Sequence, residues 1–295
     1  EARKPSRSLA SFTKLSQSMK TTEDSKMTSD SVVRASAADI AAYQDQGYIQ
    51  YKAFFSSAEM DRLREAIDAA IAANRARIVG AQNDGRTSEE YEKVFNQMVN
   101  LWVDSPEAKQ FSFSKRLAET GRQLSGSQHV RIYHDHAMIK PAGQDSRATN
   151  WHQDAPYWPM EPACGFSAWI AVDDVTIPNG CLHFVPGSHK FGLLEPINLG
   201  LAGDSIVDRM RDQGHHVAEP VAMEMEAGGV TFHDGCNFHY AGPNLTDNPR
   251  RAHAIIYIPD DTKFTGGKDA AGAAEEMTPG NPWDHPLHPI LASEA

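Results

Sequence analysis

The sequence has no long apolar run, few cysteines and less positive than negative charge. No segment approaches the roughly 18 apolar residues of a membrane-spanning helix. The formal net charge of -11 argues against a general binder of nucleic acid or of anionic membranes. Three widely spaced cysteines without a Cys-x-x-Cys pair exclude a dense disulfide framework. We therefore expect an intracellular protein, most simply a cytoplasmic one, with neither nucleic acid nor membrane as partner.

The first thirty residues differ from the rest of the chain. They are rich in serine, lysine and arginine and hold few large apolar side chains, so they bury too little surface to offset the entropy of ordering. We predict a disordered tail over residues 1–30 and one domain over residues 31–295. The tail is open to three interpretations: an organellar import segment, a leader that is not native to the protein, or a plain flexible end.

The front of the predicted domain carries helical signals. Ser36 can cap a helix that ends at Gln46, before an extended run over Tyr48–Tyr51. Ser56 with Glu59 forms a capping box ahead of an amphipathic helix that reaches about Val79. The polar stretch Gly80–Glu90 is typical of a loop. Ser105 and Pro106 begin a further helix to about Leu124.

After Gly126 the pattern changes to short β-rich runs separated by turns. The runs are His129–Lys140, Phe166–Val172, Cys181–Val185, Val230–His233 and Ala252–Pro259. Residues 266–282, rich in alanine, glycine and proline, have the composition of a surface loop. Helices followed by many strands predict an α+β fold: an antiparallel jelly-roll core with N-terminal helices packed on one side.

Thirteen histidines exceed what packing alone requires in a chain of this size. The sole His-x-Asp is His152-Gln153-Asp154. In an extended segment these two side chains point to the same side and reach one metal ion together. Two histidines and one carboxylate on one face of an octahedral ion leave three positions open, which is typical of non-haem Fe(II) oxygenases. The tripeptide alone is a weak signal.

A downstream segment strengthens the prediction of a metal site at His152 and Asp154. His239 follows a β-rich run and precedes a Gly-Pro-Asn turn, and Arg250 enters the last strong strand. An arginine can grip a dicarboxylate through two parallel hydrogen bonds, a geometry that lysine does not reproduce. Taken singly, His239 is better explained as a turn residue, and Arg250 as a solvated charge at the end of a strand.

Four motifs that together indicate a known family follow one another along the chain: MIKPAG, NWHQDAPYW, SAWIAVDDVTIPNGCLHFVPGSHK and HYAGPN followed by PRRAHAIIY. From roughly Gly47 to Pro259 the chain resembles the phytanoyl-CoA dioxygenase family. These are Fe(II)- and 2-oxoglutarate-dependent oxygenases built on a cupin-like double-stranded β-helix. The resemblance implies that the chain hydroxylates a small molecule with O2, coupled to conversion of 2-oxoglutarate to succinate and CO2. Related halogenases lack the carboxylate ligand, so the presence of Asp154 favours hydroxylation or a related oxidation.

The resemblance also implies roles for individual residues. His152, Asp154 and His239 would bind iron. Arg250 would bind the distal carboxylate of 2-oxoglutarate, and Trp169, His136 and, from the helical side, Gln97 or Asn100 would line its pocket. Ala241 departs from the pattern, since relatives often carry a serine there that bonds the co-substrate. No long basic cradle for a CoA 3′-phosphate is evident, which favours a substrate other than a CoA thioester.

Four further residues are candidates for the substrate pocket. They are Tyr157, Trp158, His189 and His233. The two aromatic residues could instead cap the end of the barrel, and the two histidines could be loop or packing residues.

Other functions remain open at this point. His134-Asp135-His136 could form a cupin-type metal site with His239 or His233, which would make the enzyme independent of 2-oxoglutarate. A jelly roll that binds metal and ligand without catalysis is a second alternative. A serine hydrolase has little support, since no Gly-x-Ser-x-Gly elbow occurs.

Overall fold

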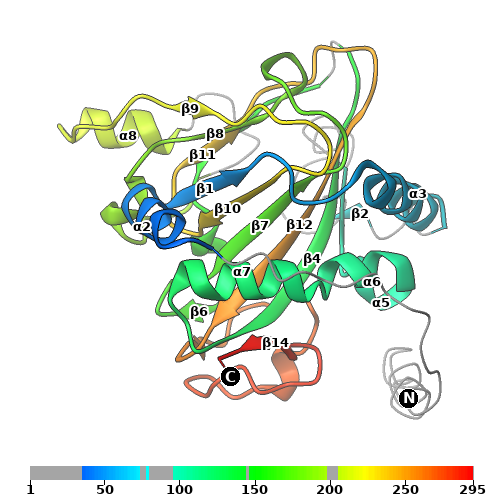
Figure 1. Ribbon diagram of the computed structural model, residues 1–295. Coiled ribbons are helices and arrows are strands. Elements are labelled where there is room, and N and C mark those ends of the chain that lie inside the picture. The colour runs from blue at the N-terminus through cyan, green and yellow to red at the C-terminus, as the bar shows by residue number, and fades with distance from the viewer. Residues whose placement is uncertain (1–34, 74–77, 80–95, 144–145, 198–204, 295) are drawn as a thin grey trace, which may run out of the picture. The chain divides into compact units, whose positions relative to one another are not determined.

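The computed structural model describes residues 35–73, 78–79, 96–143, 146–197 and 205–294. The chain divides after Ser31 into two units, and every described residue belongs to the second (Figure 1). The predicted tail 1–30 and the predicted loop Gly80–Glu90 lie outside the described residues. Among the helices that are described, none has the length and apolar character needed to cross a bilayer.

The larger sheet has eight strands and is antiparallel throughout. Its order is β1 (Tyr48–Tyr51), β10 (Val230–Asp234), β7 (Phe166–Ala171), β12 (Arg250–Pro259), β4 (His129–Lys140), β3 (Asn96–Val99) and β2 (Ile78–Val79), with β14 (Ile290–Ser293) also paired to β4. Figure 1 shows its central strands side by side.

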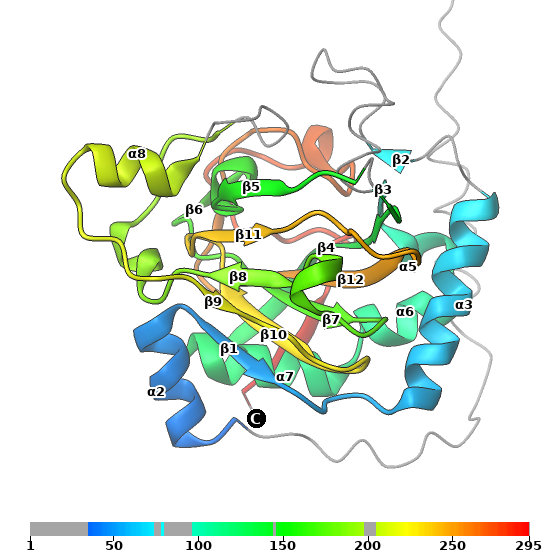
Figure 2. The same ribbon diagram turned by 90° about the horizontal axis from the view of Figure 1, so that it is seen from above.

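A smaller antiparallel sheet faces the larger one. Its order is β5 (Thr149–His152), β11 (His239–Ala241), β8 (Leu182–Phe184) and β9 (Val221–Ala222). A separate ribbon pairs β6 (Met160–Glu161) with β13 (Lys263–Phe264). In Figure 2 the smaller sheet lies on one side of the larger sheet and helix α7 on the other. The predicted α+β jelly roll with helices on one side is confirmed.

Serine caps begin three of the helices, at Ser36, Ser56 and Ser105, as the sequence predicts. The helices are α2 (Ala37–Gln46), α3 (Ser57–Ala73), α5 (Leu101–Asp104), α6 (Pro106–Ser112), α7 (Lys115–Ser125) and α8 (Ile206–Asp212). Short 3-10 turns are η2 (Ala155–Tyr157), η3 (Ile177–Asn179), η4 (Ser188–Phe191) and η5 (Ala274–Glu276). Ser36 caps α2 in a box with Asp39, and Ser56 with Glu59 does the same for α3.

Two predicted helices are shorter than expected. The helix predicted to reach Val79 ends, as α3, at Ala73, and Ile78–Val79 instead pair with β3 as a strand. The helix predicted over residues 105–124 is broken into α6 and α7. Ser114 has an extended ψ of 115° and accepts a hydrogen bond from the Leu117 amide, so it caps a second helix where we expected a continuous one.

Two of the three apolar clusters pack the two sheets and their covering helices together. One packs the helices against the outer face of the larger sheet, with Met60, Leu63 and Phe111 against Phe166 and Phe232. The other fills the space between the sheets and surrounds the residues described next. The barrel interior is therefore walled by rigid strands on both sides.

Candidate metal and co-substrate site

The two predicted histidine ligands are cross-strand partners. His152 closes β5 and His239 opens β11, and the antiparallel register places one opposite the other. Their ring centroids are 4.0 Å apart, within the distance at which opposite residues of a sheet interact. The smaller sheet thus brings together two residues that are remote in sequence.

Asp154 reaches the same point from a turn. Its backbone is in the helical region (φ -81°, ψ -39°) at the start of η2, so the predicted extended path from His152 ends one residue early. The amides of Asp154 and Ala155 both donate to the carbonyl of Gly235 at 2.9 Å. A Cβ on Gly235 would lie 2.5 Å from the Trp158 ring and 2.7 Å from the Gly165 carbonyl oxygen, so this close approach requires glycine.

The three side chains converge. Oδ1 of Asp154 lies 3.4 Å from His152 Nε2 and 3.5 Å from His239 Nε2. One ligand atom from each residue lies within 4.8 Å of the others, and within the described part of the chain no other trio of histidine, cysteine, aspartate or glutamate meets this condition.

Hydrogen bonds fix the orientation of both imidazoles. Nδ1 of His152 lies 2.6 Å from the Asn150 carbonyl oxygen, and Nδ1 of His239 lies 3.1 Å from that of Asn237. A carbonyl only accepts, so each Nδ1 donates its hydrogen, and in the neutral ring each Nε2 has a lone pair for a metal ion.

The electrostatics agree with this assignment. Burial, with His152 nearby, lowers the pKa of His239 to about 3, so the ring is neutral near pH 7. Burial acts to raise the pKa of Asp154, but the adjacent imidazoles outweigh it and hold that pKa well below its ordinary value. Two imidazole nitrogens and a carboxylate that converge on one point are suited to bind a cation. Two nitrogen ligands and one oxygen ligand fit Fe(II).

A cavity of about 340 Å³ opens beside these residues, and Arg250 lies in its wall. Arg250 is 3% exposed, and its Nη2 donates to the Gly180 carbonyl at 2.9 Å. Its guanidinium carbon lies 5.3 Å from the ring centroid of Trp169. Burial lowers its pKa to about 10, so it is still charged at neutral pH. No described carboxylate forms an ion pair with it, so the site is suited to an anion that enters from outside.

The remaining co-substrate candidates line the same cavity. Trp169 comes from β7 and His136 from β4. Gln97 also lines it, but from strand β3 and not from the helical side as predicted. Asn100 lies outside the lining; its side chain donates instead to the Ala270 carbonyl at 2.8 Å. Ala241 lines the cavity with its methyl group, where relatives were expected to carry a serine.

Three of the four substrate-pocket candidates reach the cavity. Tyr157, Trp158 and His233 line it, and Tyr157 also donates its hydroxyl to the Ile197 carbonyl at 2.6 Å. His189 is not brought there. Its Nε2 lies 3.1 Å from the Gln44 carbonyl oxygen, and its ring packs on Gly47.

The alternative metal site on β4 does not assemble. Nδ1 of His134 lies 3.5 Å from Nδ1 of His136, and both rings line the cavity. However, neither ring joins His233 or His239 in a group of three converging ligand atoms among the described residues. Burial lowers the pKa of His134 to about 3 and that of His136 to about 4, so both are neutral walls near pH 7.

The sequence patterns did not predict several of the residues that line the cavity. Lys140 is 2% exposed, lies opposite Arg250 in the sheet register, and donates to the Arg147 carbonyl at 2.9 Å. Burial, with Arg250 nearby, lowers its pKa. The alternation of side chains along β4 could have predicted Lys140, because every second residue of this stretch lines the cavity: His134, His136, Met138 and Lys140.

Comparison with known proteins agrees with this geometry. The phytanoyl-CoA dioxygenase (PhyH) family model matches residues 43–252. A phytanoyl-CoA dioxygenase domain-containing protein 1 homolog of Dictyostelium discoideum is 27% identical over 62% of this chain and 66% of its own length, just under two thirds of that relative.

Two solved structures are also similar. The carbocyclase SnoK from nogalamycin biosynthesis has a TM-score of 0.72 and 22% identity, with 87% of this chain and 96% of that chain covered. EctD from S. alaskensis, solved with bound Fe, has a TM-score of 0.63 and 25% identity, with 81% and 82% covered. The family match spans the three converging ligands and Arg250. The chain belongs to the phytanoyl-CoA dioxygenase family.

Proposed function

We propose that the protein is an Fe(II)- and 2-oxoglutarate-dependent dioxygenase that hydroxylates a small molecule. The observation that carries this proposal is the convergence of His152, Asp154 and His239 beside a cavity whose wall contains a buried arginine without a carboxylate partner among the described residues. Family membership supports the same reaction class.

The proposed roles follow from the contacts. His152, Asp154 and His239 would hold the iron. When bound, iron supplies the activation of O2 that is coupled to oxidative decarboxylation of 2-oxoglutarate to succinate and CO2.

The chain's other residues bind and orient. Arg250, held by the Gly180 carbonyl and stacked near Trp169, would bind the distal carboxylate of 2-oxoglutarate with its remaining donors. His136 and Gln97 would form the neighbouring wall. These contacts come from strands and not from loops, which fixes the co-substrate in one orientation relative to the ligands.

The presence of Asp154 supports hydroxylation rather than halogenation, because no ligand position is vacated for a halide. Tyr157, Trp158 and His233 would contact the substrate. Aromatic walls exclude water from the reacting centre.

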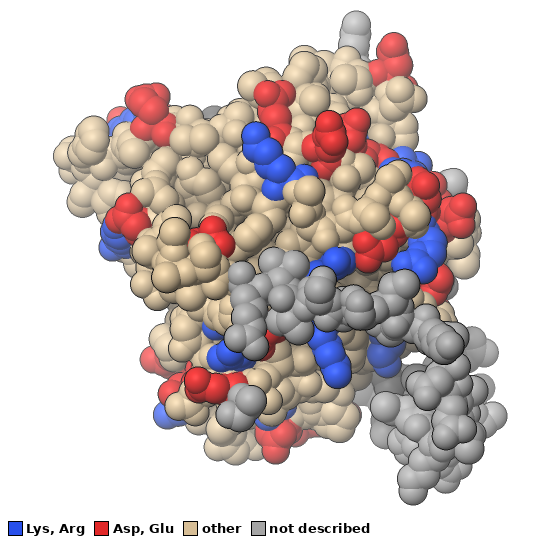
Figure 3. Space-filling model, in the orientation of Figure 1, with Lys and Arg blue, Asp and Glu red and all other residues tan. Residues whose placement is uncertain are grey.

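The volume of the cavity supports a compact substrate. A cavity of about 340 Å³ that also receives 2-oxoglutarate suits a small metabolite. On the face drawn in Figure 3, lysines and arginines are interspersed with acidic residues. The absence of a long basic cradle in the sequence supports a substrate other than a CoA thioester. All three cysteines are free, which supports an intracellular, reducing compartment.

The test is the co-substrate requirement. Purified protein loaded with Fe(II) under nitrogen is given O2 and candidate metabolites, with and without 2-oxoglutarate, and succinate and O2 uptake are measured. We expect 2-oxoglutarate-dependent succinate release that one metabolite stimulates. O2 uptake that does not require 2-oxoglutarate would refute the proposal, and protein kept anaerobic is the control.

A further inference from the structure

Asp154 has one carboxylate oxygen, Oδ2, that does not face the histidine ligands, and two other side chains lie close to it. Oδ1 faces His152 and His239, whereas Oδ2 lies 3.4 Å from His233 Nε2 and 3.4 Å from Ser167 Oγ. The carboxylate is therefore in contact with polar groups through both of its oxygens.

His233 and Ser167 form a matched pair. They stand opposite each other on the neighbouring strands β10 and β7, so their side chains project from the same face of the sheet. Both are 2% exposed. Each of these strands has a partner on both sides, so the pair is carried by rigid backbone.

The His233 ring has no other hydrogen-bonding role among the described residues. Neither ring nitrogen has a hydrogen-bond partner that meets ordinary geometry. The ring is packed between Phe184, with centroids 5.0 Å apart, and His239, with centroids 4.9 Å apart. A buried imidazole N–H without an acceptor is costly. Oδ2 of Asp154 lies 3.4 Å from Nε2, outside the geometry of an ordinary hydrogen bond, and is the acceptor that the packing offers.

The consequence concerns how Asp154 binds an ion. A carboxylate binds through one oxygen or through both, and an unrestrained Oδ2 is able to turn toward the ion and occupy a second position. Partners on Oδ2 oppose this rotation, much as a ligating histidine is oriented by the group that its other nitrogen contacts.

We propose that His233 and Ser167 are positioning residues that hold Oδ2 of Asp154, so that Asp154 presents Oδ1 alone to the metal. The pair thereby preserves the open positions that an oxygenase needs. This proposal rests on the proposed function only for the reason why open metal positions matter. The contacts of Oδ2 with His233 and Ser167 do not depend on the co-substrate.

The experiment uses Co(II) as the probe. The full chain is stripped of metal and titrated with Co(II) under nitrogen, with affinity measured by calorimetry and ligand geometry by the visible absorption of the bound ion. The variants are His233→Phe, which keeps a ring and removes the donors, His233→Gln, which restores one donor, and Ser167→Ala. The control is His183→Phe, a half-buried ring on β8 that contacts the Cys181 carbonyl and does not line the cavity.

We expect His233→Phe to weaken Co(II) binding by about ten- to a hundred-fold, as loss of such a partner typically does, and to alter the visible spectrum. Ser167→Ala should have a smaller effect in the same direction, and His233→Gln should recover part of the affinity. The His183→Phe control should bind Co(II) as the unaltered chain does.

Wild-type affinity and spectrum in both His233→Phe and Ser167→Ala would overturn the proposal. So would a lower melting temperature of the metal-free protein with unchanged Co(II) binding, because that result describes a packing residue. If His233→Phe does not fold, Ser167→Ala and His233→Gln decide by the same criteria. Failure of the unaltered chain to bind Co(II) would instead refute the metal centre itself.

Discussion

His152 and His239 face each other across β5 and β11, with ring centroids 4.0 Å apart. Because the register of the smaller sheet sets this distance, the two nitrogen ligands are placed before any metal arrives. Asp154, on the turn that follows, completes the group.

Replacing Asp154 by alanine should decrease substrate-stimulated succinate formation by at least about a hundred-fold. The reason is that the ion would lose the one anionic ligand that the protein supplies. Succinate is measured by chromatography. Asp208→Ala, on the exposed face of α8, is the control. Undiminished turnover by Asp154→Ala would show that Asp154 is not a ligand.

Arg250→Lys should raise the KM for 2-oxoglutarate by about ten- to a hundred-fold, since a hydrogen bond to a charged group contributes roughly 1.5–3 kcal/mol and lysine lacks the fork. Initial rates at varied 2-oxoglutarate give the KM. Arg122→Lys, an arginine paired with Glu119 on α7, should leave it unchanged. An unaltered KM in Arg250→Lys would exclude a role in co-substrate binding.

Ala241→Ser should lower the KM for 2-oxoglutarate about three- to tenfold. The methyl group of Ala241 lines the cavity, and a hydroxyl there would add one hydrogen bond worth about 1 kcal/mol. The same kinetic measurement applies, with Ala252→Ser, at a fully buried position on β12 that does not line the cavity, as comparison. A raised KM would mean that the hydroxyl clashes with the co-substrate.

Ala270→Phe should decrease the substrate-stimulated rate and leave the KM for 2-oxoglutarate unchanged. Ala270 lines the cavity and is held by Asn100 and by the Tyr133 hydroxyl, whereas Arg250 lies opposite Lys140, at the other end of β4. A ring there would narrow the substrate end. The metabolite found in the co-substrate assay is the probe, and a parallel loss of 2-oxoglutarate affinity would contradict this division of the cavity.

The metal-free protein should lose stability as pH falls below about 6.5. Burial lowers the pKa of His134, His239 and His253 from 6.5 to about 3 and that of His136 to about 4. Between these folded values and 6.5, the unfolded chain binds protons that the folded chain does not, so the free energy of unfolding decreases as pH falls. Asp135 acts oppositely: burial raises its pKa to about 7, so the folded chain keeps a proton that the unfolded chain releases above 3.8.

Four histidines against one carboxyl leave a net difference of roughly three protons, or roughly 4 kcal/mol per pH unit at the steepest point. Urea unfolding at pH 7, 6 and 5 measures this slope. A free energy of unfolding that is equal at all three values would show that these histidines are protonated in the folded chain.

Local patterns predicted the parts of this molecule that depend on local chemistry. The caps at Ser36 and Ser56 begin helices because a side-chain oxygen satisfies amides within the same turn. The ligand set followed from His-x-Asp together with ordered motifs that resemble a family, and the geometry brings those residues together.

What escaped prediction depends on contacts between distant segments. A register shift between Ile256 and Tyr257 leaves Tyr133 unpaired in β4, so that both Tyr133 and His134 line the cavity. No feature of the expected surface loop 266–282 revealed that Ala270 would reach the cavity, because its position depends on hydrogen bonds to Asn100 and Tyr133. Ala270 also lies beyond the segment that the family model matches.

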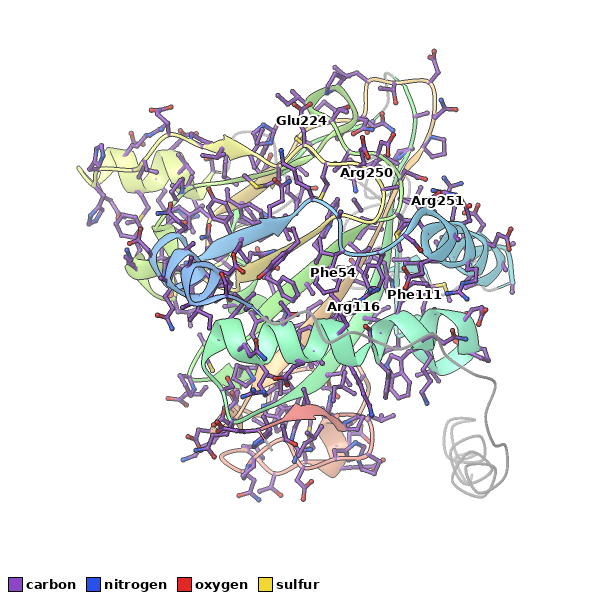
Figure 4. All side chains as sticks on the ribbon, in the orientation of Figure 1. Phe54, Phe111, Arg116, Glu224, Arg250 and Arg251 are labelled. Atoms are coloured by element: carbon purple, nitrogen blue, oxygen red, sulfur yellow. The ribbon has the colours of Figure 1, made fainter. Side chains whose placement is uncertain are left out.

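The adjacent residues Arg250 and Arg251 point to opposite faces of β12 (Figure 4). Arg250 lines the cavity, while Arg251 lies beside α3 and pairs with Asp68 at 2.8 Å and with Asp173 at 3.1 Å. A slide of β12 that moved Arg250 by one residue, into the place of Arg251, would turn its guanidinium to the outer face and remove the dicarboxylate anchor from the barrel. The ion pairs of Arg251 on the outer face therefore favour the register that places Arg250 in the cavity wall. Substitutions at Asp68, on the outer surface, should therefore weaken the binding of 2-oxoglutarate, although Asp68 does not line the cavity.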